Sequence, residues 1–163
     1  MSFPDKKYSN FKKFNDHYLK TIEKASRFNK SSNFKKIISI IEKNYKSKKD
    51  KLYVCGNGGS AATANHFACD HQKILFETGR IKPNIISLNS NSSLTTAISN
   101  DINYNNIFSE QLKYNSKADD ILIVLSCSGN SLNIVNALNF AKKKKDYYNK
   151  FYWFYRWESK KIV

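Results

Sequence analysis

Three short apolar runs, each followed by a segment with helical spacing of its apolar residues, set the pattern of this chain from residue 51 onward. The runs cover residues 52–55, 84–88 and 121–125. They show little alternation of polar and apolar residues, which indicates strands that are buried on both faces. The helical segments cover residues 59–77, 92–99, 104–115 and 130–145. This alternation predicts an α/β domain, a doubly wound parallel sheet flanked by helices.

The first 50 residues follow another pattern, because they are rich in lysine and contain no strand-like run. Apolar residues from Phe34 to Tyr45 recur at spacings of three and four, which predicts one apolar stripe on a helix that starts near Ser32. We therefore expect a helical extension over residues 1–50, ahead of the α/β domain over residues 51–145.

Length and composition narrow the class of protein. The chain has 163 residues, of which 40% are hydrophobic and 14% aromatic, which is enough for one folded domain and too much for a disordered chain. No apolar run approaches the ~20 residues that span a bilayer. Residues 1–14 lack the apolar core of a secretory signal. The sequence thus predicts a cytoplasmic protein with no membrane partner.

The net charge of +15 raises the question of nucleic-acid binding. Of the 28 basic residues only Arg27, Arg80 and Arg156 are arginine, whereas nucleic-acid interfaces favour the planar guanidinium group. Lysine, asparagine and isoleucine are abundant, and their codons share A and T. We interpret most of the charge as nucleotide bias on a solvated surface, with a nucleic-acid-binding patch as the less favoured alternative.

Cysteine usage gives no sign of a disulfide framework or a zinc knuckle. The chain has three cysteines, Cys55, Cys69 and Cys127, with no pair spaced as C-x-x-C. We interpret them as small buried hydrophobic residues.

The first apolar run leads into the sequence GNGGS at residues 56–60, where a helix is expected to begin. Glycines allow the backbone to approach a ligand closely, and the amides of a helix N-terminus favour an anion. The spacing matches neither the dinucleotide-binding nor the P-loop pattern. The alternative is a tight strand-to-helix turn without a ligand.

The third apolar run ends in the sequence SCSGNS at residues 126–131, which also opens a helix. Its hydroxyl and amide side chains beside free backbone amides suit a phosphate monoester. Serine and asparagine also cap helices, so a purely structural role is the alternative. Because the carboxyl ends of parallel strands share one edge of the sheet, both loops are expected at one site.

Two pairs of polar residues add candidate chemistry. His66 and Asp70 lie four residues apart, on one face of a helix, where they can share a metal or act as acid and base. Two ligands do not complete a zinc site, and a hydrogen-bonded surface pair is the alternative. Asp101, after Asn100, can bind sugar hydroxyls or move a proton, although an Asn-Asp pair after a helix also forms turns.

Taken together, the motifs closely resemble the sugar isomerase (SIS) domain family and, within it, the phosphoheptose isomerases. The motifs are GNGGSAA at residues 56–62, NHFA at 65–68, AISND at 97–101 and SCSGNS at 126–131. The resemblance covers roughly residues 10–145. It implies an SIS-type doubly wound sheet, and aldose–ketose isomerisation of a phosphorylated seven-carbon sugar through an enediol.

The resemblance also assigns roles to residues. His66 falls on a zinc ligand, and Asp70 falls where the family usually has a glutamate that binds zinc and takes part in proton transfer. Asp101 is the second candidate for proton transfer. The remaining positions imply substrate binding, with the phosphate held by the serine loop: Asn57, Gly58, Gly59, Ser60, Asn100, Asp101, Ser126, Cys127, Ser128 and Ser131. The resemblance further implies a homodimer or homotetramer.

The last part of the chain departs from the family. Eight aromatic residues lie between Tyr147 and Trp157, where the family continues with a strand, a Thr-Gly loop and a helix that carries further zinc ligands. If residues 145–163 use AT-rich codons, reading one base later gives KIIIINFTGFIDGKVKKL, which has that strand and loop. We therefore interpret residues 146–163 as an atypical aromatic tail from a one-base slip in the lysine run, with the loss of a sheet strand and an incomplete C-terminus. A naturally short variant with an aromatic docking tail is the alternative.

Overall fold

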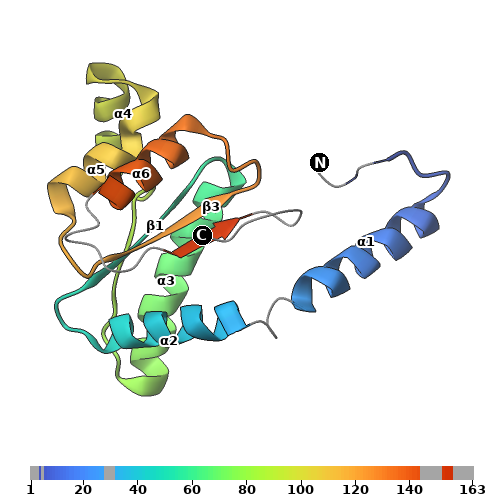
Figure 1. Ribbon diagram of the computed structural model, residues 1–163, viewed down its shortest axis with the longest axis horizontal. Helices are drawn as coiled ribbons and strands as arrows, with labels where there is room; N and C mark the ends of the chain where they lie inside the picture. Colours follow the sequence, from blue (N-terminus) through green and yellow to red (C-terminus); the bar gives the residue numbers. More distant parts are fainter. Residues whose placement is uncertain (1–3, 5, 28–31, 144–151, 156–163) are drawn as a thin grey trace.

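A parallel sheet lies between two layers of helices in the computed structural model, which describes residues 4, 6–27, 32–143 and 152–155 (Figure 1). The spatial order of its strands is β2-β1-β3-β4, and every neighbouring pair is parallel. The strands are β1 (Lys51–Gly56), β2 (Asn84–Ser87), β3 (Ile121–Ser126) and β4 (Tyr152–Tyr155). This arrangement confirms the predicted α/β class with a parallel sheet.

Four helices follow the strands in the predicted order. They are α3 (Gly59–Gly79), α4 (Ser92–Asp101), α5 (Ile107–Asn115), preceded by the 3-10 turn η2 (Tyr104–Asn106), and α6 (Leu132–Lys143). One boundary changes the description of the candidate site. The helix expected to end at residue 99 continues through Asp101, because Ile102 N–H still donates to the Ile98 carbonyl. Asn100 and Asp101 therefore occupy the last turn of α4 rather than a loop after it.

Both faces of the sheet are covered, as the unbroken apolar runs predicted. Leu52 and Val54 of β1 belong to one core with Ala64 and Ala68 of α3. The alternate residues Tyr53 and Cys55 belong to the second core, which includes residues of α4, α5 and α6. Because successive side chains of a strand point to opposite faces, a strand buried on both sides needs an apolar residue at every position.

The two N-terminal helices differ in how they pack. In α2 (Ser32–Lys46), Ile40, Ile41 and Tyr45 pack against the core on the α3 face of the sheet. In α1 (Phe11–Ser26) no residue is buried, and Figure 1 shows the helix apart from the sheet. Among the described residues, no helix is both long enough and apolar enough to cross a membrane.

The aromatic segment contributes the strand β4. Its backbone pairs with β3, with Tyr152 opposite Ile123 and Tyr155 opposite Ser126. Tyrosine, tryptophan and phenylalanine favour strands, so this composition suits the position. The segment thus supplies a strand where the frame-slip hypothesis expected one to be lost. Residues 144–151 and 156–163 lie outside the described part of the chain, and the hypothesis itself stays a prediction.

Candidate functional site

The strand β1 ends at Gly56, a position without room for a side chain. A Cβ atom there would lie 2.6 Å from the Cβ of Ser60 and 2.8 Å from the carbonyl oxygen of Leu125. The side chain of Asn89, just after β2, holds the same residue from the other side. Its Oδ1 accepts from Gly56 N–H at 3.0 Å, and its Nδ2 donates to the Gly56 carbonyl at 2.9 Å. The start of the glycine loop is therefore fixed by its neighbours.

The next glycines leave space open above the start of α3. Gly58 has a φ of +55°, a conformation that favours glycine, and it precedes the first turn of the helix without a side-chain cap. A Cβ atom on Gly58 or Gly59 would meet nothing within 4 Å. The start of α3 thus borders open space at Gly58 and Gly59, and a helix N-terminus favours an anionic group.

Asn57, which lies between Gly56 and Gly58, connects the glycine loop to two other elements. Its Nδ2 donates to Asn133 Oδ1 at 2.8 Å, and Asn133 Nδ2 donates back to Asn57 Oδ1 at 2.9 Å. The hydroxyl of Tyr104 in η2 also donates to Asn57 Oδ1, at 3.2 Å. These bonds bring the glycine loop, the start of α6 and the segment after α4 together at the carboxyl edge of the sheet.

The serine loop folds on its own backbone at the same edge. Ser126 Oγ accepts from Gly129 N–H at 3.0 Å, and Ser128 Oγ accepts from Asn130 N–H at 3.2 Å. Gly129 has a φ of +68°, which allows the tight turn. The Ser131 carbonyl accepts from Val135 N–H and so begins α6. The loop therefore presents its hydroxyl groups next to a helix N-terminus.

Asn100 and Asp101 lie exposed on the last turn of α4 and pair with each other, with Asn100 Nδ2 donating to Asp101 Oδ1 at 2.8 Å. Within the described ranges, no hydrogen bond connects this pair to the glycine or the serine loop. Tyr104, three residues later, makes that connection. The structure therefore places the pair in the segment beside the site and does not show it inside the hydrogen-bonded cluster.

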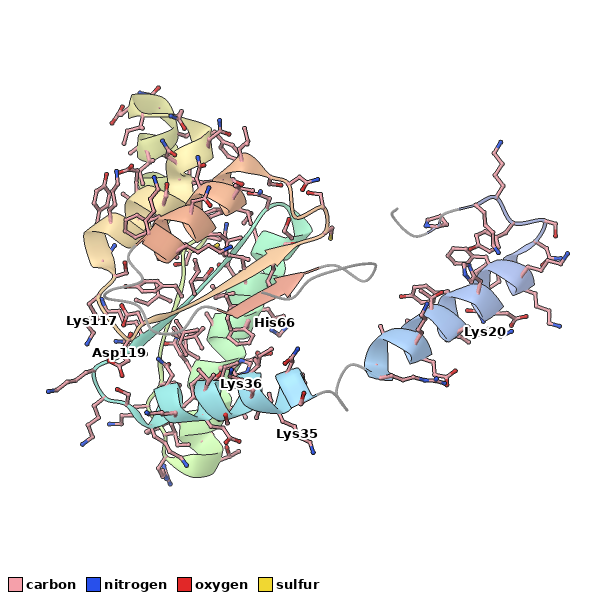
Figure 2. The ribbon with its side chains drawn as sticks, viewed as in Figure 1. Lys20, Lys35, Lys36, His66, Lys117 and Asp119 are labelled. Carbon is pink, nitrogen blue, oxygen red and sulfur yellow. The ribbon has the colours of Figure 1, made fainter. Side chains whose placement is uncertain are left out.

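His66 and Asp70 lie on one face of α3, as their spacing predicted, with His66 Nδ1 2.7 Å from Asp70 Oδ2. Figure 2 labels His66 on this helix. Their side chains are 75% and 45% exposed. Among the residues that the structure describes, no group of three or more histidine, cysteine, aspartate or glutamate side chains could hold a metal. Since a zinc site takes at least three protein ligands, the described residues do not complete one.

The cysteines do not share one environment. Cys55 is fully buried in β1, and burial raises the pKa of its thiol. Cys69 on α3 and Cys127 in the serine loop are exposed. The interpretation of all three as buried hydrophobic residues is therefore wrong for two of them, because both lie outside the sheet.

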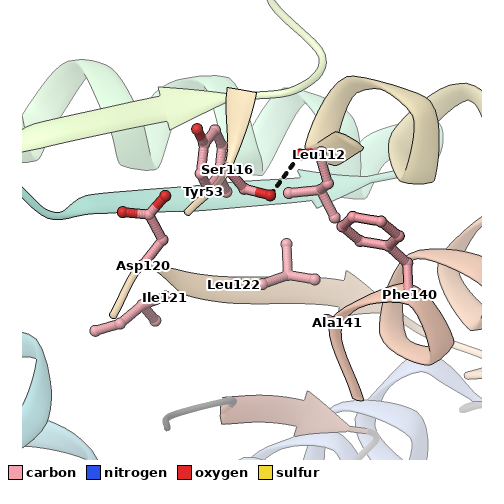
Figure 3. Close-up of a pocket in the computed structure, with 8 residues that line it drawn as sticks. All are labelled: Tyr53, Leu112, Ser116, Asp120, Ile121, Leu122, Phe140 and Ala141. Atoms are coloured by element: carbon pink, nitrogen blue, oxygen red, sulfur yellow. Dashed lines mark hydrogen bonds between the residues drawn. The ribbon is translucent and has the colours of Figure 1, made fainter. Parts of the chain in front are cut away.

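A cavity at the opposite, amino edge of the sheet does not provide a second candidate site (Figure 3). Its volume is about 10 Å³, room for about one water molecule, and Tyr53, Leu112 and Phe140 are among the residues that line it. Asp120 at its rim accepts from Lys51 N–H at 2.7 Å and from Lys117 N–H at 2.9 Å. This carboxylate holds the start of β3 to β1, a structural role.

The sequence interpretation missed Asn89, Asn133 and Tyr104. Asn133 had a detectable signal, because it is a polar residue at a core-facing position of α6, followed by the buried Ile134 and Ala137. The other two carry no signal in the sequence, since their role depends on which loops meet in three dimensions.

The fold and these loops define an α/β protein with an anion-compatible site at the carboxyl edge of a parallel sheet. The family model for the SIS domain matches residues 13–147, and the chain belongs to this family.

Curated relatives and solved structures agree with this assignment. The chain is 42% identical over 94 residues to a phosphoheptose isomerase from Neisseria meningitidis, which covers 58% of this chain and 47% of the relative. It is 38% identical over 126 residues to a probable phosphoheptose isomerase from Thermoplasma acidophilum, covering 76% and 69%. The chain thus spans about half the length of the first of these relatives.

Two solved phosphoheptose isomerases share the fold. The structure from Francisella tularensis matches with a TM-score of 0.72 and 28% identity, covering 91% of this chain and 76% of that one. The structure from Neisseria gonorrhoeae matches with a TM-score of 0.67 and 26% identity, covering 88% and 72%.

Proposed function

We propose that the chain is an isomerase of the phosphoheptose type, which converts sedoheptulose 7-phosphate to a heptose 7-phosphate through an enediol. One observation carries the proposal: the Asn57–Asn133 pair joins the glycine loop to the start of α6, directly after the serine loop. Two helix N-termini with small, polar loops are thereby held at one edge of the sheet. The names of the relatives supply the substrate class.

The phosphate binds at the serine loop in this proposal. The loop offers the hydroxyls of Ser126, Ser128 and Ser131 and the first amides of α6, all suited to phosphate oxygens. Gly58 and Gly59 leave room for the rest of the sugar above α3. Ser60, Cys127 and Asn100 complete the proposed binding positions.

The reaction requires a base that removes a proton from the carbon beside the carbonyl and returns it to the neighbouring carbon. We assign this proton transfer to Asp70, oriented by its contact with His66, or to Asp101, oriented by the amide of Asn100. Hydrogen-bond donors of the loops stabilise the enediolate oxygen.

Zinc belongs to the proposal only in part. We propose that His66 and Asp70 bind zinc together with ligands outside the described residues, and no step of the reaction is derived from it. Zinc content of the purified protein, compared with a His66→Ala variant, tests this assignment. Equal zinc content in both proteins would exclude His66 as a ligand.

A homodimer or homotetramer is the proposed assembly. The helix α1 supports it, because Phe11, Leu19 and Ile22 are exposed on a helix that buries none of its residues. A second copy of the chain could cover these side chains. Sedimentation of the protein should show an assembly that a Phe11→Ser/Ile22→Ser variant weakens, and a monomeric wild-type protein would contradict the proposal.

We also propose that the protein is cytoplasmic and has no nucleic-acid partner. The labelled lysines of Figure 2 support the second point, because Lys20 lies on α1, Lys35 and Lys36 lie on α2, and Lys117 precedes β3. These four lysines therefore lie on three separate parts of the fold. Binding to DNA or RNA at 0.15 M salt would contradict the second point, and cell fractionation tests the location.

Turnover of sedoheptulose 7-phosphate, followed by NMR, tests the activity. We expect the variant of the residue that transfers the proton, Asp70→Asn or Asp101→Asn, to lower the rate by a factor of about 100 or more. Asp119→Asn is the matched control, since Asp119 is exposed and lies at the opposite edge of the sheet. Wild-type rates in both site variants would contradict the assignment of the base.

The second candidate is an SIS module that binds a phosphosugar without catalysis. It is favoured by the incomplete set of metal ligands among the described residues and by Asp70, where the resemblance leads one to expect glutamate. Binding of sedoheptulose 7-phosphate without turnover would support this candidate over the isomerase.

A further inference from the structure

Asn133 is a polar residue in the most buried part of the candidate site. Its side chain is on α6, and the residue is only 1% exposed. The neighbouring residues Ile134 and Ala137 belong to the apolar core. A buried amide is stable only when its polar atoms have partners, so the partners of Asn133 show what it does.

Both polar atoms of Asn133 are used. Its Oδ1 accepts from Asn57 Nδ2 at 2.8 Å and from the Ile134 amide at 2.9 Å, and its Nδ2 donates to Asn57 Oδ1. The bond to the Ile134 amide defines Oδ1 as the acceptor. The reciprocal pair with Asn57 then fixes the orientation of the Asn57 amide as well, because a flipped amide would place like atoms against each other.

The side-chain amide of Asn57 can make one more hydrogen bond, through its NH₂ group. Its Oδ1 already accepts two bonds, from Asn133 Nδ2 and from the Tyr104 hydroxyl. Its Nδ2 makes one bond, to Asn133 Oδ1. One N–H of Asn57 is therefore without a partner among the described residues, and Asn57 is half-buried directly before Gly58, which borders open space.

We infer that Asn133 is a positioning residue, which holds the Asn57 amide so that it presents an N–H group, and not its oxygen, to an acceptor oxygen of the bound sugar phosphate. The inference rests on the proposed function and adds the residue that sets the polarity of the site at Asn57. An Asn57 N–H in this position favours carbonyl, enediolate or phosphate oxygens and disfavours a ligand group that can only donate.

The test is a double-mutant cycle on binding of sedoheptulose 7-phosphate, measured by calorimetry with wild type, Asn57→Ala, Asn133→Ala and the double variant. We expect each single variant to weaken binding about tenfold or more. In the Asn57→Ala background, Asn133→Ala should cause no further loss, because Asn133 acts through Asn57. A merely structural role would give losses that multiply.

The control is Asn136→Ala, on the same helix and one turn further on. Its Nδ2 donates to the Asn105 carbonyl and to Asn106 Oδ1, outside the Asn57 pair, so we expect wild-type affinity. If Asn133→Ala does not fold, Asn133→Asp is used, with Asn136→Asp as its control. The aspartate keeps both acceptor bonds and cannot donate to Asn57 Oδ1, and it should also weaken binding.

The outcomes separate the two proposals. If wild type binds and Asn133→Ala binds equally well, or if the losses multiply, the positioning role is overturned while the proposed function stands. If wild type does not bind the phosphosugar, the proposed function fails and the positioning role fails with it.

Discussion

The two edges of the sheet use similar polar groups for opposite purposes. At the amino edge, Asp120 accepts two backbone N–H groups, and the Tyr53 hydroxyl donates to the Asn115 carbonyl at 2.7 Å. These bonds close the chain on itself and leave a cavity of about 10 Å³. At the carboxyl edge, Asn89 and Asn57 fix the loops, while Gly58 and Gly59 leave space above them.

The two edges differ in whether hydrogen-bond donors remain available to a ligand. At the amino edge, both Asp120 oxygens and the Tyr53 hydroxyl bond to groups of the same chain. The carboxyl edge fixes the backbone with side-chain amides and keeps the N-terminus of α3 uncapped. Rigid surroundings with unused donors are what a small-molecule site needs. Substitutions at the two edges should therefore affect different properties.

The largest effect is expected at Gly56. In Gly56→Ala the new Cβ would lie 2.7 Å from the Ser60 backbone and 2.8 Å from the Leu125 carbonyl oxygen, so the backbone must shift. We expect a loss of about 3 kcal/mol in the free energy of unfolding, measured in urea. Gly59→Ala is the matched control, because its Cβ meets nothing within 4 Å. It should stabilise the fold by about 0.5 kcal/mol. Equal losses in both would show that the two glycines do not differ as described.

The next effect concerns the amino edge. Asp120→Ala removes both acceptors of the Lys51 and Lys117 amides and leaves two part-buried donors without this partner. We expect a loss of about 2 kcal/mol in unfolding free energy, with sugar-phosphate binding unchanged. The control is Asp119→Asn next to it, exposed at a φ of 69° that asparagine tolerates, and its stability should be that of wild type. Weaker sugar-phosphate binding in Asp120→Ala would contradict the expectation that the amino edge affects stability and not binding.

The pH dependence of Asp120 gives a smaller effect. Burial raises the pKa of this carboxyl, and the Lys117 and Lys51 amides and charges oppose the shift without cancelling it. A folded-state pKa above the unfolded value of 3.8 means that the folded state binds the proton more tightly. The difference in unfolding free energy between wild type and Asp120→Ala should therefore be largest below pH 3.8, the unfolded pKa. It should decrease as the pH rises through the raised pKa of the folded state. Urea unfolding from pH 3.5 upward measures it, and an advantage that grows with pH would contradict the direction.

The smallest effect is expected at the serine loop. Cys127 is exposed, so Cys127→Thr should change the unfolding free energy by less than about 0.5 kcal/mol.

A thiol reagent should modify Cys127 and Cys69 in the folded protein and spare Cys55, which is buried and has a raised pKa. Modification of Cys55 at the same rate would show that the core beneath the carboxyl edge is open.

Much of the fold could be predicted from the sequence because its signals are local. The strand β3, for example, has an apolar residue at every position from Ile121 to Leu125, which is the pattern expected of a short strand covered on both faces. Glycines and serines after such strands indicated the two loops, since ligand sites of doubly wound sheets lie there. The His66–Asp70 contact followed from helical spacing alone.

The remaining features could not be predicted because they depend on residues distant in the chain. Asn57 and Asn133 are 76 positions apart, and Asn89 and Gly56 are 33 apart. Asparagine is frequent in this chain, so composition does not distinguish a structural amide from a solvated one. The end of α4 was placed too early for a different reason. An Asn-Asp pair is common in turns, and here the helix hydrogen bonds continue past it.

Asn89 shows how a side chain can imitate a peptide group. The backbone ladder between β1 and β2 ends with Leu88 N–H donating to the Val54 carbonyl. Beyond it, the Asn89 amide offers Gly56 one donor and one acceptor, as the next residue of a strand would. The chain after β2 is therefore free to turn toward α4 while Gly56 keeps its bonds. One side-chain amide thus replaces one residue of a neighbouring strand, and a substitution at Asn89 alone would change the backbone bonds of Gly56 at the carboxyl edge.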